Sequence, residues 1–396
     1  MKIYLNFLIF VLLIISVSGC SRPTPPPREA INIQPWGSMD LNISKDDTCF
    51  SIKQSMGNAL LYKLEHTKAN HQKEINILAL SGGGSHGAYG IGLIEGWKDS
   101  KNMPKFDMVT GVSTGSILAT FVFLGGDYID YIANVYTHLQ TKNIYYYNFL
   151  KLFGGSSLTN TQPLKDMLRE GVTEELLKKV AQEYHKGRRL YMATTNIDAG
   201  KPVIWDMTAI AASDHPNKLQ LYRDIIYASC ALPSVFDPQY FEIKYKNKKY
   251  YQMHIDGGIY AHVFMIGLFE NWKDVLNIQT KEKYGVNVYV IGNRKYRLLD
   301  TKQPLESDGI LEILTQVATH SIDLIYDRSL YRLYKGCQKE GYNFYYTGID
   351  DNITTHSFSH QFIPKDMKKL YEQGYKKGIG KIPWQRTIAQ DELLYH

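Results

Sequence analysis

The spacing of hydrophobic and polar positions changes repeatedly between residues 75 and 124. Short apolar runs of strand length occur at Ile75–Leu80 and Phe106–Thr110, and helix-compatible segments follow at Ala88–Trp97 and Ser116–Leu124. A turn that contains glycine separates each predicted strand from the helix after it. Two strand–turn–helix units in succession predict βαβ connections and a largely parallel sheet.

The rest of the chain adds strands first and helices last. Apolar runs predict strands at Arg189–Thr195, Val203–Trp205, Lys248–Ile255 and Val286–Ile291. Spacing predicts a polar helix near Pro163–His185, amphipathic helices at Ile310–Tyr334 and Pro364–Lys377, and a weaker helix near Ser55–Glu65. We therefore expect an α/β fold with a mostly parallel central sheet and a helical C-terminal region.

The N-terminus has the pattern of an export signal. Lys2 precedes an apolar run, Ile3–Val17, that is short for a transmembrane helix and ends in Val17-Ser18-Gly19-Cys20. This resembles the lipobox of bacterial lipoproteins, which implies lipidation of Cys20 and anchoring to a membrane; Ser21 after it favours the outer membrane. An ordinary secretory signal with a chance cysteine is the alternative. The proline-rich stretch Arg22–Arg28 predicts an extended tether.

Composition narrows the classes of function. The chain has 396 residues, of which 44% are hydrophobic, enough for a large core. Its net charge of +6 comes from scattered basic residues, and no nucleic-acid-binding signature is present. No Cys-x-x-Cys pair predicts a metal site. If Cys20 is acylated, the remaining Cys49, Cys230 and Cys337 allow at most one disulfide.

A serine lies between two glycines in Gly111-Val112-Ser113-Thr114-Gly115, after a predicted strand and before a predicted helix. Small neighbours allow a strand to turn sharply into a helix and to lift the hydroxyl clear of the sheet. The amides at the start of that helix would then face an oxyanion formed above Ser113. The alternative is a serine that only caps the helix.

Three consecutive glycines follow the first predicted strand in Ser81-Gly82-Gly83-Gly84-Ser85-His86-Gly87. Their N–H groups can point into a cavity, which suits an anion or a tetrahedral intermediate. The segment Gly82–Gly87 also satisfies the dinucleotide-binding pattern, but no acidic residue ends a second strand at the required distance. A P-loop is excluded because no Gly-Lys-Ser/Thr follows.

An aspartate followed by two glycines, Asp256–Gly258, ends the predicted strand Lys248–Ile255. This is also the commonest composition of a plain turn. His254 lies two residues earlier and therefore on the same face of the strand. It could assist in a triad, although a structural histidine is the simpler interpretation.

Together these motifs resemble the patatin-like phospholipase family. The Gly-Gly-Gly-x-x-Gly loop, the elbow serine about thirty residues later and the distant Asp-Gly-Gly occur in the family's order. The block Ala228–Phe236 is similar to the family's Ala-Ser-x-Ala-x-Pro block. The resemblance covers roughly Ile75 to Gly267, about half of the chain.

The resemblance implies a three-layer α/β/α fold and a Ser–Asp dyad with no catalytic histidine, no metal and no cofactor. Ser113 falls on the nucleophile, Asp256 on its base, and Gly82, Gly83 and Gly84 on the oxyanion loop. It implies hydrolysis of carboxylic esters of membrane lipids through an acyl-enzyme, as in phospholipases A and lysophospholipases. Asp198, in Asp198-Ala199-Gly200, is the nearest sequence rival to Asp256.

One position departs from the family. Members often carry arginine or lysine where this chain has His86. A neutral histidine stabilises an anion less than a permanent cation. This favours either another ester or better activity below pH 6.5.

We thus expect a lipid-anchored serine hydrolase with four regions: a signal peptide (1–19), a tether and lead-in (20–72), a catalytic core (75–270), and a C-terminal strand and helical extension packed on the core (271–396). The alternatives are a catalytically silent lipoprotein that uses the fold for binding, and a general carboxylesterase. The aromatic stretch Tyr145–Phe153 is expected in the core rather than in a lid.

Overall fold

The computed structural model describes residues 22–40, 50–51, 59, 62, 74–148, 150–151, 155–265, 285–295, 310–353 and 359–388. The expected signal peptide, its Cys20 and Ser21, and most of the helix expected near Ser55–Glu65 lie outside these residues, as does Cys49. The two described cysteines, Cys230 and Cys337, are buried free thiols. Among the described helices, none combines the length and the apolar character needed to cross a membrane.

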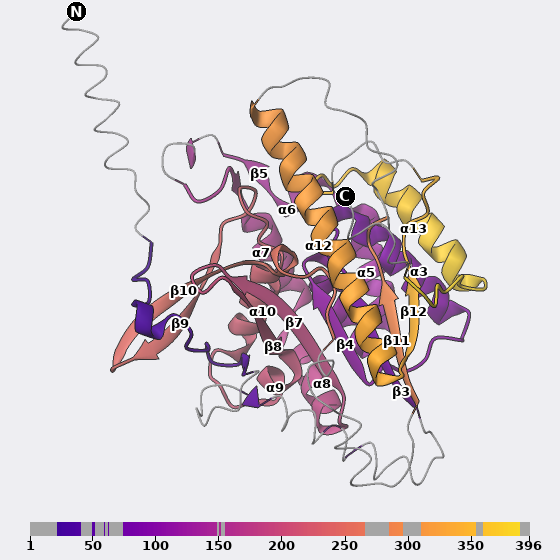
Figure 1. Cartoon of the computed structure of the whole chain (residues 1–396), viewed down its shortest axis with the longest axis horizontal. Helices are drawn as coiled ribbons and strands as arrows, with labels where there is room; N and C mark the ends of the chain where they lie inside the picture. Colours follow the sequence, from indigo (N-terminus) through magenta and orange to yellow (C-terminus); the bar gives the residue numbers. More distant parts are fainter. Residues whose placement is uncertain are drawn as a thin grey trace, which may run out of the picture.

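A mostly parallel sheet forms the centre of the molecule (Figure 1). Its described strands lie in the order β12 (Asn343–Thr347), β11 (Gly285–Ile291), β3 (Glu74–Leu80), β4 (Met108–Val112), β7 (Arg189–Asn196), β10 (Lys248–Asp256) and β9 (Gln239–Tyr245). In addition, β8 (Lys201–Asp206) pairs with β7. The five strands from β12 to β7 are parallel, whereas β8, β10 and β9 pair with their neighbours in antiparallel fashion.

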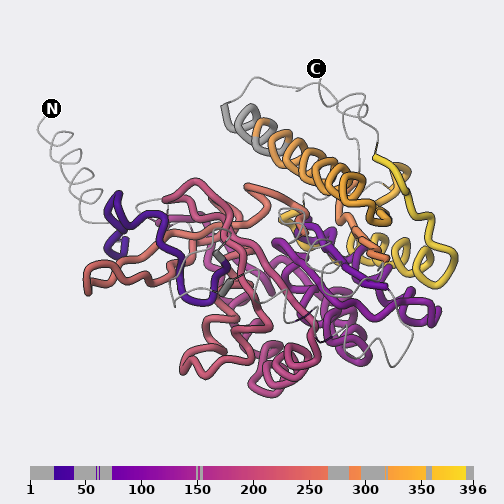
Figure 2. The backbone as a smooth tube through the Cα atoms, turned by 60° about the horizontal axis from the view of Figure 1, so that its bottom comes forward, coloured from indigo at the N-terminus to yellow at the C-terminus, as the bar shows by residue number. Residues whose placement is uncertain are grey.

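Helices cover both faces of the sheet, as a three-layer α/β/α fold requires (Figures 1 and 2). On β3, Leu78 and Leu80 face one buried apolar cluster and Ile77 and Ala79 face the other. A strand buried on both faces needs apolar residues at successive positions, which explains the continuous apolar runs in the sequence. The expected fold class is therefore confirmed.

The two helical layers differ in size. The larger layer contains α3 (Gly87–Asp99), α4 (Thr114–Leu124), α5 (Asp127–His138), α7 (Gln162–Gly171), α8 (Glu174–His185), α9 (Met207–Ala212), α10 (Lys218–Ser229) and α13 (Pro364–Ile379). The other face is covered mainly by α12 (Ile310–Glu340), which lies in front of the sheet in Figure 1.

Three local expectations needed adjustment. The second strand, expected at Phe106–Thr110, runs from Met108 to Val112 and reaches the elbow serine directly. The single helix expected near Pro163–His185 is two helices, because the chain leaves α7 at Val172 and the Thr173 side chain caps a new helix. Strands β9 and β12 were not predicted, since both are edge strands in which aromatic and polar residues replace a continuous apolar run.

The described C-terminal elements complete the fold. Strands β11 and β12 belong to the same sheet as β3 and β4, so strands on both sides of residue 270 share one sheet. Helix α13 packs closely against α3: a Cβ added at Gly92 would lie 2.3 Å from the carbonyl oxygen of Tyr371, and one at Gly374 would lie 2.1 Å from that of Tyr89. Glycine allows this approach of two helix backbones.

Residues 22–40 lie along β10 and β8 (Figure 2). The Tyr251 N–H of β10 donates to the carbonyl oxygen of Thr24 at 2.9 Å. Arg22 forms an ion pair with Asp198, and the Gln252 amide donates to the carbonyl oxygens of Ile31 and Ile33. The described part of the expected tether is therefore bound to the body, because its carbonyl oxygens accept hydrogen bonds from β10.

Candidate active site

Ser113 forms a tight elbow between β4 and α4. Its backbone has φ +54° and ψ −128°, an unfavourable conformation for a residue with a side chain. A Cβ at Gly111 would lie 2.4 Å from the Gly115 carbonyl oxygen, and one at Gly115 would lie 2.4 Å from that of Leu80. Only glycine fits at both flanking positions, so the Gly-x-Ser-x-Gly spacing follows from the packing of the elbow.

Asp256 reaches Ser113 because β4 and β10 share one edge of β7. Val112 of β4 pairs with Ala193, and Asp256 of β10 pairs with the next residue, Thr194. Thr194 also pairs with Val203 of β8, on the opposite edge. Strand β4 runs parallel to β7 and β10 runs antiparallel, so their carboxyl ends meet.

The two side chains form a hydrogen bond. Ser113 Oγ donates to Asp256 Oδ2 at 2.7 Å, and the Gly258 N–H donates to Oδ1 at 2.7 Å. Asp256 is 5% exposed. Burial raises the pKa of its carboxyl to about 6, although both hydrogen bonds and the positive charge of Arg294 oppose the rise. A carboxylate with such a pKa is a far better proton acceptor than an exposed aspartate.

The block Ala228–Phe236 holds the elbow and the aspartate in place. The Ser113 N–H donates to Ser229 Oγ at 3.0 Å, and this hydroxyl donates to the Ala193 carbonyl oxygen at 2.8 Å. The Asp256 N–H donates to the carbonyl oxygen of Ala231 at 3.0 Å. The block was identified from the sequence by its resemblance to the family, and these hydrogen bonds explain its role: it positions Ser113 and Asp256.

The glycine loop lies against the elbow from the side of β3. Gly83 and Gly84 have positive φ angles of +155° and +54°, and both line the same cavity as Ser113. The Gly82 N–H instead donates to the carbonyl oxygen of His262 at 3.3 Å. Of the three glycines expected in an oxyanion loop, Gly83 and Gly84 are thus the ones whose amides can face the cavity.

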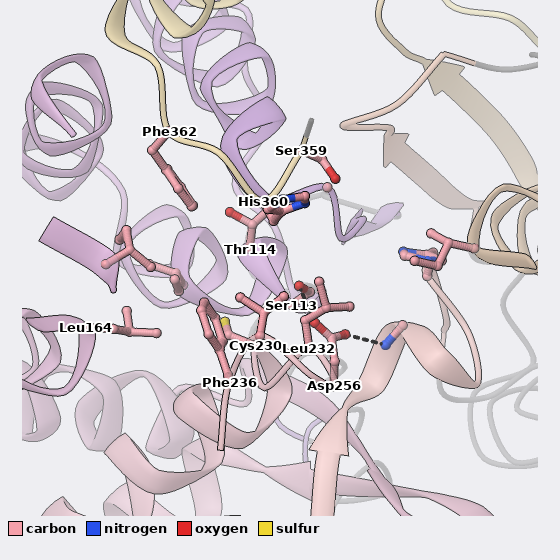
Figure 3. A pocket seen from close by; sticks show the side chains of 18 of the residues that line it. Ser113, Thr114, Leu164, Cys230, Leu232, Phe236, Asp256, Ser359, His360 and Phe362 are labelled. Carbon is pink, nitrogen blue, oxygen red and sulfur yellow. Dashed lines mark hydrogen bonds between the residues drawn. The ribbon is translucent and has the colours of Figure 1, made fainter. Parts of the chain in front are cut away.

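A largely apolar cavity that is partly open to solvent lies beside Ser113. Figure 3 shows Ser113 and Asp256 next to each other, with Phe362 and Leu164 further along the cavity. Its apolar lining includes Ile117, Leu139, Ile144, Leu164, Met167, Leu232, Val235, Phe236 and Phe362. A cavity with this lining suits a chain-like apolar ligand.

The alternative residues lie elsewhere. The His254 ring makes a 2.8 Å hydrogen bond with Thr194 Oγ1, packs against Phe241 and does not line the cavity. Burial lowers the pKa of His254 to about 3. Asp198 pairs with Arg22 and accepts the Met253 N–H, also away from the cavity. These contacts favour structural roles for both residues.

His86 stays neutral at physiological pH. Burial, followed by the nearby Arg294 charge, lowers the pKa of His86 to about 4. This is below the pKa of Asp256, so acidification would protonate the aspartate before it charged the histidine. The pKa values therefore argue against an activity that improves below pH 6.5.

His262 and Arg294 are among the polar residues of the cavity that were not predicted from the sequence. His262 follows the Asp-Gly-Gly turn, is 6% exposed, and has no hydrogen-bond partner on either ring nitrogen within the described residues. Arg294 follows β11. Ligand sites of parallel sheets gather at the carboxyl ends of strands, and this rule applied to Val286–Ile291 would have pointed to Arg294.

The aromatic stretch Tyr145–Phe153 only partly follows the expectation of a core position. Tyr145 is buried, packs against Phe236 and donates to the His360 carbonyl oxygen at 3.0 Å. Tyr146 and Tyr147, which form β5 (Tyr146–Tyr147), are 50% and 58% exposed. Among the described strands, β5 pairs with β6 (Thr159–Asn160), outside the central sheet, so these two rings stay largely exposed.

Fold and site together define a class of α/β protein in which a strand–helix elbow presents a serine to a buried aspartate. Among the described residues, no group of three or more histidine, cysteine, aspartate or glutamate side chains is arranged to hold a metal ion. Residues 78–265 match the family model described as Patatin-like phospholipase, so this part of the chain is a patatin-like phospholipase domain.

Curated relatives of low sequence identity also include phospholipase and patatin proteins. The chain is 23% identical over 248 residues to the cGAMP-activated phospholipase of Escherichia coli (strain TW11681), which covers 58% of this chain and 65% of that protein. It is 25% identical over 224 residues to Patatin-07 of Solanum tuberosum, covering 52% and 54%, respectively. The matched region thus spans less than two thirds of each of these relatives.

Among solved structures, the chain is similar to VipD from Legionella pneumophila, with a TM-score of 0.32 and 13% sequence identity. This match covers 77% of the present chain and 66% of VipD.

Proposed function

We propose that this protein is a serine lipid acyl hydrolase that cleaves carboxylic esters of lipids through a Ser113–Asp256 dyad. The observation that carries the proposal is the 2.7 Å hydrogen bond between Ser113 Oγ and Asp256 Oδ2 beside a largely apolar cavity. The family implies lipid ester hydrolysis, and the geometry supplies the groups that this chemistry needs.

In the proposed first step, Ser113 Oγ attacks the ester carbonyl carbon while its proton passes to Asp256 Oδ2. The carbonyl π electrons move onto oxygen and form a tetrahedral oxyanion. Collapse of this intermediate breaks the carbon–oxygen bond to the alcohol, which takes the proton from Asp256. Water then repeats the sequence on the acyl-enzyme and releases the fatty acid.

The oxyanion is proposed to lie at the amides of Gly83 and Gly84. Both residues line the cavity together with Ser113, whereas the Gly82 N–H already donates to the backbone carbonyl oxygen of His262. Backbone donors that are already oriented need no reorganisation when charge develops, and removal of one such donor costs about 10²- to 10³-fold in kcat.

The acyl chain is proposed to occupy the cavity beyond Ser113. Phe362 and Leu164 lie along it, away from Asp256 in Figure 3. Transfer of each methylene from water to an apolar site contributes about 0.8 kcal/mol, so the cavity favours lipid esters over small water-soluble esters. This preference separates a lipid hydrolase from a general carboxylesterase.

We also propose that Cys20 is lipidated and that the enzyme acts on membrane lipids of the bacterial envelope, at the outer membrane. The sequence motif motivates this proposal. Residues 22–40 pack on β10, and Arg22 pairs with Asp198. These contacts support the proposal because they would hold the catalytic domain close to a lipid anchor at Cys20.

A fluorophosphonate probe tests the proposed nucleophile. The wild-type protein should be labelled and should release fatty acid from a diacyl phospholipid, and Ser113→Ala should do neither. Ser116→Ala serves as a matched control, because Ser116 lies one turn further along the chain and donates to the Ser113 carbonyl oxygen. Absence of both labelling and hydrolysis in the wild type would favour the catalytically silent alternative.

A further inference from the structure

Buried polar atoms without partners gather on one side of the proposed site. Within the described residues, Arg294 Nε, His86 Nε2 and both ring nitrogens of His262 are buried and make no hydrogen bond. An unsatisfied buried donor or acceptor is costly, so several in one place indicate a ligand that satisfies them. Arg294 and His262 line the cavity that contains Ser113.

Arg294 is attached firmly to the glycine loop. The neighbouring Asn293 donates from its backbone N–H to Ser81 Oγ and from its side chain to the Ser81 carbonyl oxygen, both at 2.8 Å. A Cβ at Gly83 would lie 2.5 Å from the carbonyl oxygen of Asn293. The backbone that carries Arg294 therefore packs directly on the proposed oxyanion loop.

The guanidinium of Arg294 is oriented by one ion pair and keeps a buried donor with no partner among the described residues. Its Nη1 donates to Asp323 Oδ1 of α12 at 2.9 Å, and both side chains are 10% exposed. Its Nε has no partner among the described residues. A guanidinium has five N–H donors in a planar fork and remains charged in proteins, so pairing with one carboxylate leaves donors for a second anion.

The positive charge of Arg294 reaches the proposed dyad. It contributes to the lowered pKa of His262, for which burial is the larger cause, and it opposes the raised pKa of Asp256. His262 itself is neutral at pH 7, since its pKa is about 3. Arg294 is therefore the cation among the described residues that line the cavity, and His262 is a neutral hydrogen-bonding group that lines it as well.

We propose that Arg294 determines specificity by binding the phosphate of a phospholipid whose neighbouring ester lies at Ser113. This inference rests on the proposed function and adds to it the residue that selects the substrate. It also accounts for His86: the fixed charge that the loop lacks at that position is supplied from the end of β11. His262 lies beside Gly82 and Gly258, where an added Cβ would come within 2.8 Å of its ring, and it can donate a second hydrogen bond to the bound phosphate.

The test compares two substrates that differ only in the phosphodiester headgroup. Dihexanoyl phosphatidylcholine and dihexanoylglycerol are supplied as monomers, and kcat/KM is measured for each. Arg294→Gln should reduce kcat/KM for the phospholipid about 10- to 100-fold, the range expected for loss of a hydrogen bond to a charged group. The loss on dihexanoylglycerol should be much smaller, and Arg294→Lys should restore part of the preference.

Lys295→Gln is the matched control. Lys295 is the adjacent cation, but its Nζ donates to the Asp351 carbonyl oxygen and it does not line the cavity. Its removal should leave the ratio between the two substrates unchanged. Because Arg294→Gln removes the ion pair with Asp323, the double variant Arg294→Gln/Asp323→Asn removes both charges of that pair, and melting curves confirm folding of each variant.

A binding experiment tests the role of Arg294 without requiring hydrolysis. Ser113→Ala is titrated with a dialkyl ether phospholipid, the matching dialkylglycerol, and inorganic phosphate alone. Tighter binding of the ether phospholipid that depends on Arg294 supports the proposal even if turnover is never observed. An equal loss on both substrates, an unchanged ratio in Arg294→Gln, or binding of inorganic phosphate without binding of the ether phospholipid would overturn it.

Discussion

Ser113 and Asp256 are joined by a 2.7 Å hydrogen bond although 143 positions separate them in the sequence. The cause is the sheet: β4 and β10 end at consecutive residues, Ala193 and Thr194, on one edge of β7. The block Ala228–Phe236 then fixes both backbones through Ser229 Oγ and the Ala231 carbonyl oxygen. The geometry of the pair thus depends on strand pairing rather than on a flexible loop.

Replacement of the proposed base should abolish turnover. Asp256→Asn keeps the shape of the side chain but cannot accept the proton of Ser113, so kcat should fall by about two or more orders of magnitude, as for loss of a general base. Steady-state hydrolysis of a phospholipid by folded protein provides the measurement.

Two further variants examine the competing residues. His254→Ala removes the hydrogen bond to Thr194 and leaves a cavity beside Phe241, so it should lower stability and retain turnover. Asp198→Asn should weaken the contact with Arg22 and also retain turnover. A folded but inactive His254→Ala protein would indicate a triad, and an inactive Asp198→Asn protein beside an active Asp256→Asn protein would show that the wrong aspartate was chosen.

The pH–rate profile should reflect a single carboxyl group in the acid range. Asp256 must be ionised to accept a proton, and its pKa is about 6, so kcat/KM should rise with pH and reach half its maximum near pH 6. The pKa values of His86 and His254, about 4 and 3, lie below this range. A midpoint that disappears in His86→Ala or in His254→Ala would contradict the assignment of this pKa to Asp256.

Asp256 should also make stability depend on pH. Its folded-state pKa of about 6 exceeds the ordinary value of 3.8, so the fold prefers the protonated form. This contribution to stability is fully present below pH 3.8 and is lost as the pH rises through about 6. Relative to wild type, Asp256→Asn should therefore gain on the order of 3 kcal/mol between pH 4 and pH 7.

Denaturant unfolding of both proteins at several pH values measures this difference. Ser113→Ala provides a matched comparison, because the serine hydrogen bond lowers the pKa of Asp256 and its removal should move the transition to higher pH. A stability difference between Asp256→Asn and wild type that does not change with pH would show that Asp256 is not destabilised by burial.

The glycine loop should tolerate no side chain at Gly84. A Cβ there would lie 2.0 Å from the carbonyl oxygen of Ser359, and the φ of +54° disfavours other residues. Gly84→Ala should displace the loop and reduce kcat about 100-fold or more, comparable to loss of an oxyanion donor.

Gly200→Ala separates backbone strain from this effect. Gly200 has a similar φ of +62°, but a Cβ there would meet nothing within 4 Å. Its substitution should cost about 1–2 kcal/mol of stability, the ordinary penalty of a left-handed residue, and leave kcat unchanged. Equal activity of the two variants would exclude Gly84 from the oxyanion site.

Membrane anchoring should depend on Cys20. Acyl chains contribute about 0.8 kcal/mol for each buried methylene, so a doubly or triply acylated cysteine holds a protein on a membrane almost irreversibly. Cys20→Ser should leave an unprocessed precursor that takes up no label from a radioactive fatty acid. Labelling of that variant at the wild-type level would overturn the lipoprotein proposal.

The local part of this architecture can be derived from the sequence. Strand, elbow and helix are encoded by apolar runs that end in glycines, and the close backbone packing at Gly111 and Gly115 explains why no other residue fits there. The same local signals indicated the glycine loop and placed Asp256 at the end of a strand. Such features depend on steric contacts between residues that are close together in the sequence, so they can be predicted from the local sequence.

Only the tertiary structure decided which distant groups meet. The register of β10 on β7 brings Asp256 to Ser113 and leaves Asp198 beside Arg22. Arg294 reaches the cavity from the end of β11 and His262 from the residues just after the Asp-Gly-Gly turn, and neither belongs to a motif. These contacts depend on strand order, register and burial, which arise from the packing of the whole sheet. The residues next to each contact in the sequence therefore show no pattern that predicts it.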